Sequence, residues 1–134
     1  MGLFVITLLA SHGCGSRSRG PRRFDVKGNV TFRGSTVPNG VIYFEPDASQ
    51  GNRGPVSVVP IVGGRYDTVT HKCPGPLEGP AVVRIVGYPD AKPGQEIVPP
   101  LFPEYRTTAV VTPSRAGIVI DFDVPVSRPP SAKR

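Results

Sequence analysis

Hydrophobic and polar residues alternate along much of the chain in short runs. Over residues 24–33 the hydrophobic side chains lie at Phe24, Val26, Val30 and Phe32, with polar residues between them. A two-residue period points one row of side chains to a core and the other to water, which predicts a β-strand. Further strand-like runs, separated by turns rich in Gly and Pro, lie at residues 41–45, 56–59, 65–69, 81–86, 107–112 and 117–124.

This pattern predicts an all-β fold. Seven short strands joined by Gly/Pro turns, with no predicted helix, are typical of a seven-stranded β-sandwich of immunoglobulin-like size. A domain over residues 24–125 is long enough to bury a core without disulfide bonds. The Pro-rich stretch over residues 89–103 is expected to be neither helix nor central strand, because proline lacks the amide hydrogen that both require.

Composition supports this fold and narrows the function. The 17 prolines and 16 glycines among 134 residues exclude a helical bundle or a coiled coil. The formal net charge is +6, but residues 24–125 hold nine basic and ten acidic residues, so the positive excess lies in the two flanks. A nucleic-acid-binding domain would carry a basic stripe on its folded elements, and we therefore expect no nucleic-acid partner.

The first residues have the pattern of an export signal. The apolar run at residues 3–10 matches the core of a signal peptide in length and is too short to span a bilayer. Residues 8–14, Leu-Leu-Ala-Ser-His-Gly-Cys, resemble a bacterial lipobox, in which the cysteine is lipidated and becomes the first mature residue. We therefore expect a signal peptide at residues 1–13 and a lipid on Cys14 that anchors the protein to a membrane.

Other interpretations of the N-terminus stay open. Ser11 and His12 are unusual at their lipobox positions, and no Lys or Arg precedes Arg17, which a start codon assigned too far downstream would explain. A plain cleaved signal and a chance apolar segment are the alternatives. If Cys14 carries no lipid, it could pair with Cys73 in a disulfide; if it is lipidated, Cys73 is an odd thiol.

Both flanks of the body are predicted to be solvated. Residues 14–23 hold the anchor cysteine and a basic tether with four arginines and no apolar side chain to bury. Residues 126–134 are predicted to form a disordered tail, with its positive charge at Arg128, Lys133 and Arg134.

Short motifs follow one another through the body in a fixed order. The opening is Val26-x-Gly28-x-Val30-x-Phe32-x-Gly34, and residues 37–46 continue it as Val-Pro-Asn-Gly-Val-Ile-Tyr-Phe-Glu-Pro. Gly-Arg-Tyr at 64–66, a strand at 79–85, Phe-Pro-Glu-Tyr at 102–105 and a closing strand at 120–124 come next. Over residues 24–125 this order resembles the bacterial carboxypeptidase regulatory-like, transthyretin-like domains. The resemblance implies a transthyretin-like sandwich without catalytic activity, often carried by an envelope lipoprotein.

The expected function is that of an accessory or protein-interaction module in the bacterial cell envelope, facing the periplasm or the exterior. We expect no catalytic residue, metal or cofactor. His71 and Cys73 supply two ligands where a zinc site needs four. Asp121 and Asp123, with Asp25 on a neighbouring strand, could ligate calcium, but such a row is more typical of a solvated strand face.

Two other functions are alternatives. A carbohydrate-binding module could use Tyr43, Tyr66, Tyr88 and Tyr105 as an aromatic platform, since a sugar stacks on exposed flat rings. A transthyretin-like hydrolase would need a set of His and Arg residues and a C-terminal Tyr-Arg-Gly-Ser. Here Tyr-Arg-Thr-Thr at residues 105–108 is internal, and the predicted mature chain keeps one histidine, His71.

Overall fold

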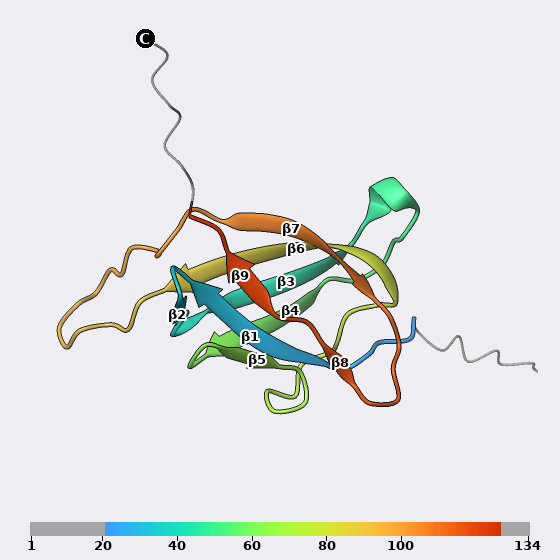
Figure 1. Cartoon of the computed structure of the whole chain (residues 1–134), viewed down its shortest axis with the longest axis horizontal. Coiled ribbons are helices and arrows are strands. Elements are labelled where there is room, and N and C mark those ends of the chain that lie inside the picture. The colour runs from blue at the N-terminus through green and yellow to red at the C-terminus, as the bar shows by residue number, and fades with distance from the viewer. Residues whose placement is uncertain (1–20, 127–134) are drawn as a thin grey trace, which may run out of the picture.

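The computed structural model describes residues 21–126, which form a mostly antiparallel β-sheet curled into a half-barrel (Figure 1). One 3-10 turn, η1 (Ala48–Gln50), lies between two of the strands. The predicted signal peptide, Cys14 and residues 127–134 lie outside the described residues. The strands are β1 (Val26–Phe32), β2 (Ser35–Thr36), β3 (Asn39–Pro46), β4 (Ser57–Val62), β5 (Arg65–Asp67), β6 (Gly79–Tyr88), β7 (Tyr105–Val111), β8 (Ile118–Val119) and β9 (Phe122–Val124).

The strand order explains the half-barrel. Strands follow one another as β2-β1-β5-β4-β3-β6-β7 with antiparallel pairing throughout. Strands β8 and β9 both pair with β1 in parallel, so β1 is shared between the main sheet and the end of the chain. In Figure 1, β9 lies beside β1 and beneath β7, which is the last strand of the path at the upper edge of the sheet.

The predicted all-β character is confirmed, although the described residues form nine strands where the sequence predicted seven. Strand β2 was not predicted. It arises because Arg33 and Gly34 have φ values of 53° and 75°, a two-residue turn that folds the chain back onto the end of β1. The run predicted as one closing strand over residues 117–124 is divided into β8 and β9, and the 3-10 turn η1 was also not predicted.

The core lies inside the curl of the sheet. As the alternation predicted, Val26 and Val30 point inward from β1, and they meet inward residues of every long strand. An aromatic cluster closes the centre: the ring centroids of Phe44, Tyr66 and Phe122 lie 5.8 to 6.2 Å apart. Burying one such ring contributes about 1.5–3 kcal/mol, so the cluster is a large part of the core's stability.

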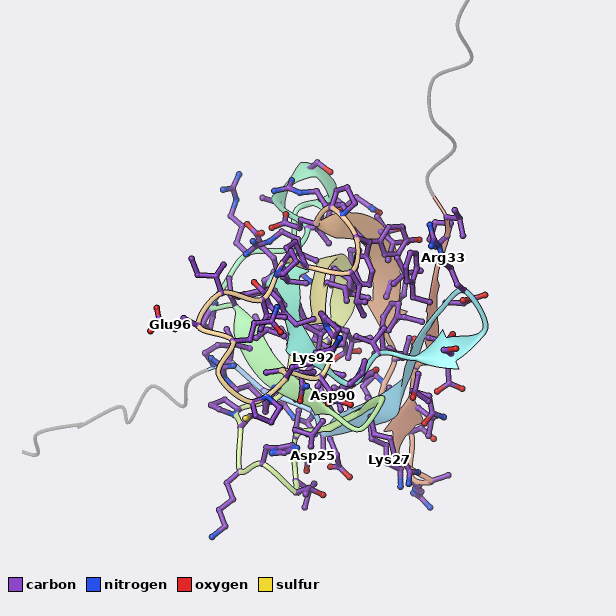
Figure 2. The ribbon with its side chains drawn as sticks, turned by 90° about the vertical axis from the view of Figure 1, so that its left-hand side faces the viewer. Asp25, Lys27, Arg33, Asp90, Lys92 and Glu96 are labelled. Carbon is purple, nitrogen blue, oxygen red and sulfur yellow. The ribbon has the colours of Figure 1, made fainter. Side chains whose placement is uncertain are left out.

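The Pro-rich connection between β6 and β7 contains no helix or strand over residues 89–103, as predicted. It faces the viewer in Figure 2, where Glu96 points outward from it. Near its end the connection returns to the core, because Phe102 is buried against Phe32 with ring centroids 4.9 Å apart. The loop is therefore tied to the domain at the point where β7 begins.

Arg23, the last residue of the predicted tether, contacts the β-sheet domain. Arg23 forms an isolated antiparallel bridge with Leu77, and its guanidinium donates to the carbonyl oxygen of Gly75 at 3.0 Å. The backbone of Arg23 is thus paired with the segment before β6, although its side chain is polar.

Between β8 and β9 the chain passes over Gly28 of β1, and this contact, called the crossing below, depends on the glycine. The Ile120 amide donates to the Lys27 carbonyl at 3.0 Å, and the Ile120 carbonyl accepts a 2.5 Å hydrogen bond from the Tyr66 hydroxyl. Gly28 lies directly under this carbonyl: a Cβ added there would be 2.0 Å from the oxygen. The absence of a side chain at Gly28 is therefore what lets the C-terminal segment reach Tyr66.

We expect Gly28→Ala to destabilise the domain by at least about 1–3 kcal/mol, the usual cost of overpacking. The added methyl group meets backbone atoms of Ile120, which cannot rotate away as a side chain can. Urea denaturation of both proteins measures the difference. Lys27→Ala, one residue earlier and exposed, is the control and should change stability by less than about 0.5 kcal/mol. Equal stability of Gly28→Ala and the wild type would contradict the crossing.

Because of Tyr66, we expect the stability of the domain to change with pH in the alkaline range. Burial raises the pKa of Tyr66 above its usual range, and the Asp121 carboxylate acts in the same direction. Above about pH 10 the unfolded chain ionises this tyrosine while the folded chain does not, so its contribution is complete below pH 10 and decreases as the pH rises.

We therefore expect Tyr66→Phe to cost about 1–3 kcal/mol at pH 8, because the Ile120 carbonyl loses its buried donor. The stability gap to the wild type should then narrow as the pH rises beyond about 10. Denaturant titrations from pH 8 to 11 measure both, with Tyr88→Phe as the control at a partly exposed tyrosine. A gap that stays constant up to about pH 11 would show that Tyr66 is not held neutral by the fold.

Candidate functional site

The structure does not bring the four tyrosines of the predicted platform together. Tyr66 is 1% exposed and points into the core, and Tyr105 packs partly against the same core. Tyr43 and Tyr88 lie on the outer face of the sheet, on β3 and β6. The four rings therefore do not share one exposed face.

Tyr43 has a structural partner. The guanidinium carbon of Arg84 lies 4.4 Å from the centre of its ring, so the cation covers the face that a sugar would use. Arg84 also lies 3.9 Å from a carboxylate oxygen of Glu45 and 3.6 Å from one of Glu104, which in turn pairs with Arg106 at 3.2 Å. These side chains form a charge network across β3, β6 and β7.

The residues considered as metal ligands are separated in the same way. Asp121 accepts the amide of Asn29 at 2.8 Å and Asp123 accepts the hydroxyl of Thr31 at 3.0 Å, so both carboxylates fasten β9 to β1. Asp25 instead accepts the hydroxyl of Thr68 at 3.0 Å. Over residues 21–126, no group of three or more His, Cys, Asp or Glu side chains is placed to share a metal ion.

His71 and Cys73 lie on the loop that follows β5. The Cys73 thiol is half-buried and donates to the His71 carbonyl at 3.5 Å, while the Cys73 amide donates to the Thr68 carbonyl at 2.9 Å. Cys73 forms no disulfide within residues 21–126, and its proposed pairing with Cys14 involves a residue outside this range.

A hollow of about 450 Å³ lies on the outer face of β8, β1, β5 and β4, at the edge of the His71 loop. Register places Lys27 opposite Asp67 and Asn29 opposite Arg65, which aligns these side chains in two outward rows. A valine from each flanking strand, β8 and β4, provides an apolar wall. The sequence pattern did not indicate this hollow, because the rows exist only through the pairing of β1 with β5.

The Asp67 carboxylate in this hollow is occupied by the fold. It accepts the amides of Val69 at 2.9 Å and Thr70 at 3.2 Å, which fixes the start of the His71 loop. The Thr70 amide lowers the pKa of Asp67, and the Val69 amide and Lys27 add to the effect. Lys27 and Arg65 form no ion pair with other residues in the described range, so they are the charges left to meet a ligand. The hollow can therefore accept a small anionic group.

A second groove, of about 440 Å³, separates β7 from β9. On the β7 side it is lined by the half-buried side chains of Tyr105, Thr107 and Ala109, and on the β9 side by Ile120 and Phe122. The carboxylates at positions 121 and 123 also border it. Tyr105 is thus the one residue of the predicted platform that lines this groove, and no second tyrosine of the platform lies beside it there.

Comparisons with known proteins identify no family for this chain. No family model matches the chain, and no curated protein or solved structure matches it either. No helix within residues 21–126 has the length and apolar character needed to cross a bilayer. What is established is an all-β domain with a mostly antiparallel sheet curled into a half-barrel.

We expect Asp67→Ala to release the His71 loop, because the amides of Val69 and Thr70 lose their acceptor. Hydrogen exchange of these two amides should become about five- to tenfold faster. Asp90→Ala is the matched control, since its carboxylate accepts the Asn39 side chain in a different part of the sheet. Unchanged exchange at Val69 and Thr70 would show that other contacts hold the loop.

Proposed function

We propose that this chain is an envelope-anchored, non-catalytic module that binds other proteins. In this proposal residues 1–13 are a cleaved signal peptide, Cys14 carries a lipid, and residues 24–125 belong to the carboxypeptidase regulatory-like, transthyretin-like sandwich domains. The positions of the motif glycines support the family assignment. Gly28 admits the chain crossing, while Gly34 and Gly64 have φ values of 75° and 77°, which side-chain-bearing residues rarely adopt.

The location of the core supports the anchor. All members of the core cluster among the described residues lie between Phe24 and Val124. Such a domain can fold whether or not the segment before it has been cleaved and lipidated. The nine peptide steps from Cys14 to Arg23 span at most about 32 Å, so a lipid on Cys14 would hold the domain close to the membrane surface.

The observation that carries the interaction role is the groove between β7 and β9, which opens beside an edge of β7 that no strand within residues 21–126 covers. The chemistry of the carboxylates that line this groove and the hollow beside the His71 loop also favours binding over catalysis. Asp67, Asp121 and Asp123 each accept hydrogen bonds from the fold itself, so they serve as structural acceptors rather than as proton donors or acceptors for a substrate.

We expect Cys14→Ser to release the protein from the membrane fraction of the bacterial cell, because the lipid attaches through the cysteine sulfur. Cell fractionation followed by immunoblotting measures the distribution, and mass spectrometry of the wild type should find a diacylglyceryl group on Cys14. Cys73→Ser is the matched control and should stay with the membrane. A Cys14→Ser protein that stays membrane-bound, or a wild-type protein with an intact Met1, would refute the anchor.

A further inference from the structure

Strand β7 has backbone hydrogen-bonding groups that no strand of the described part of the chain satisfies. It pairs with β6 on one side and ends the path of the sheet on the other. Pro80 of β6 lies opposite Val110, and its carbonyl accepts the Asp47 amide and the Asn52 side chain, so it points away from β7. Pro80 and Val110 are therefore a non-hydrogen-bonded pair, and the amide and carbonyl of Val110 point to the free edge.

Alternation along the strand extends this result. Backbone groups of an antiparallel strand point to opposite sides at successive residues, so Arg106 and Thr108 share the orientation of Val110. The free edge of β7 thus presents three amides and three carbonyls at regular spacing. Within residues 21–126 no sheet pairing and no loop hydrogen bond uses them.

Within residues 21–126, this edge has few of the features that usually protect one. Protein edges are commonly blunted by proline, lysine, a bulge or a very short strand. Strand β7 has seven residues, Tyr-Arg-Thr-Thr-Ala-Val-Val, with one charge at Arg106, and its register with β6 runs without a bulge. Threonine and valine in this run favour extended backbone. The edge is therefore suited to pair with another strand.

The groove between β7 and β9 lies next to the same edge. A strand added to β7 would point alternate side chains into this groove, against Thr107, Ala109 and Phe122. Small apolar side chains fit its volume of about 440 Å³ and its half-buried lining. The intervening side chains would point outward beside the Asp121 and Asp123 carboxylates, where positive charge is favoured.

We propose that β7 is a docking site for an extended segment of another protein, which adds a strand to the sheet edge. Main-chain hydrogen bonds to Arg106, Thr108 and Val110 hold the segment, and alternation of small apolar with basic residues selects it. This deepens the interaction role proposed above and rests on it, but it does not depend on the lipid anchor. A second copy of this chain is the less favoured occupant, because two β7 strands pairing edge to edge would leave both grooves empty.

The test is binding of a fluorescein-labelled, capped peptide, Thr-Val-Lys-Val-Lys-Val-Thr, to the full chain in detergent micelles. Fluorescence anisotropy measures the affinity, and hydrogen exchange measures protection of the Arg106, Thr108 and Val110 amides. We expect saturable binding that protects these three amides. The same peptide with methylated backbone nitrogens at both lysines should not bind. The lysines lie opposite residues of β7 such as Thr108, and after methylation they have no amide hydrogen to donate to the β7 carbonyls.

Two substitutions of Thr108 distinguish an effect on binding at the β7 edge from an effect on folding. Thr108→Pro removes an amide that points away from β6, and the ring blocks the place of the added strand, so binding should weaken by at least about tenfold. Thr108→Ala keeps the amide and should bind within about twofold of the wild type. Circular dichroism and thermal unfolding confirm that both variants are folded.

Three outcomes would overturn the proposal. The first is equal binding of the peptide to Thr108→Pro and Thr108→Ala, and the second is no binding of the peptide to the folded wild type at millimolar concentration. The third is a wild-type dimer in sedimentation velocity that Thr108→Pro converts to monomer, which would assign the edge to a second copy. Membrane release of Cys14→Ser tests the anchor separately, so failure of one result leaves the other interpretable.

Discussion

The hydrogen bond from the Tyr66 hydroxyl to the Ile120 carbonyl, made over Gly28, is the constraint on which the architecture depends. It joins β5 to the segment between β8 and β9 through the one position of β1 that has no side chain. Because the Ile120 carbonyl turns inward there, β8 can pair with β1 before Gly28 and β9 can pair with β1 after it. The same bond brings Tyr66 against Phe44 and Phe122 and so completes the aromatic centre of the core.

This crossing also determines where the molecule is open. With β9 committed to β1, its other side faces β7 across a groove rather than through backbone pairing. The half-barrel therefore ends in two strands of different kind. Strand β9 is short, and Asp123 within it and Asp121 just before it fasten it to β1, while β7 is long and nearly uncharged. The open groove and the free edge of β7 are thus a consequence of how the core closes.

Hydrophobic alternation and the positions of proline predicted those features of the fold that depend on residues close together in the sequence. The inward positions Val26 and Val30 follow from alternation, and the Pro-rich connection follows from the missing amides of proline. The division of the last strand could not be predicted, because hydrophobic residues alternate through residues 118–124 without interruption. The break arises where this segment contacts β1. The sequence of a strand does not show which strand it will pair with in parallel, so the break could not be predicted.

The candidate sites also depend on pairing between distant strands, which the sequence does not show. Lys27 and Arg65 are unremarkable polar positions in their own strands, and only the register of β1 against β5 aligns them beside one hollow. The four tyrosines look alike in the sequence, yet Tyr66 is a core residue and Tyr43 is covered by Arg84. The free groups of β7 depend on the direction of the Pro80 carbonyl, which is fixed by Asp47 and Asn52 far along the chain.

The parallel pairing of β1 with β9 has a consequence for the order of events in the cell. The amide of Asn29 meets the Asp121 carboxylate 92 residues further along, so the first long strand is completed by the last. Contacts of such separation form slowly, because a long loop must close before they stabilise the chain. A chain that emerges with its N-terminus first cannot finish its core until nearly all of it has been made. On the export route proposed above, the domain could therefore complete its core only after nearly all of it had left the channel.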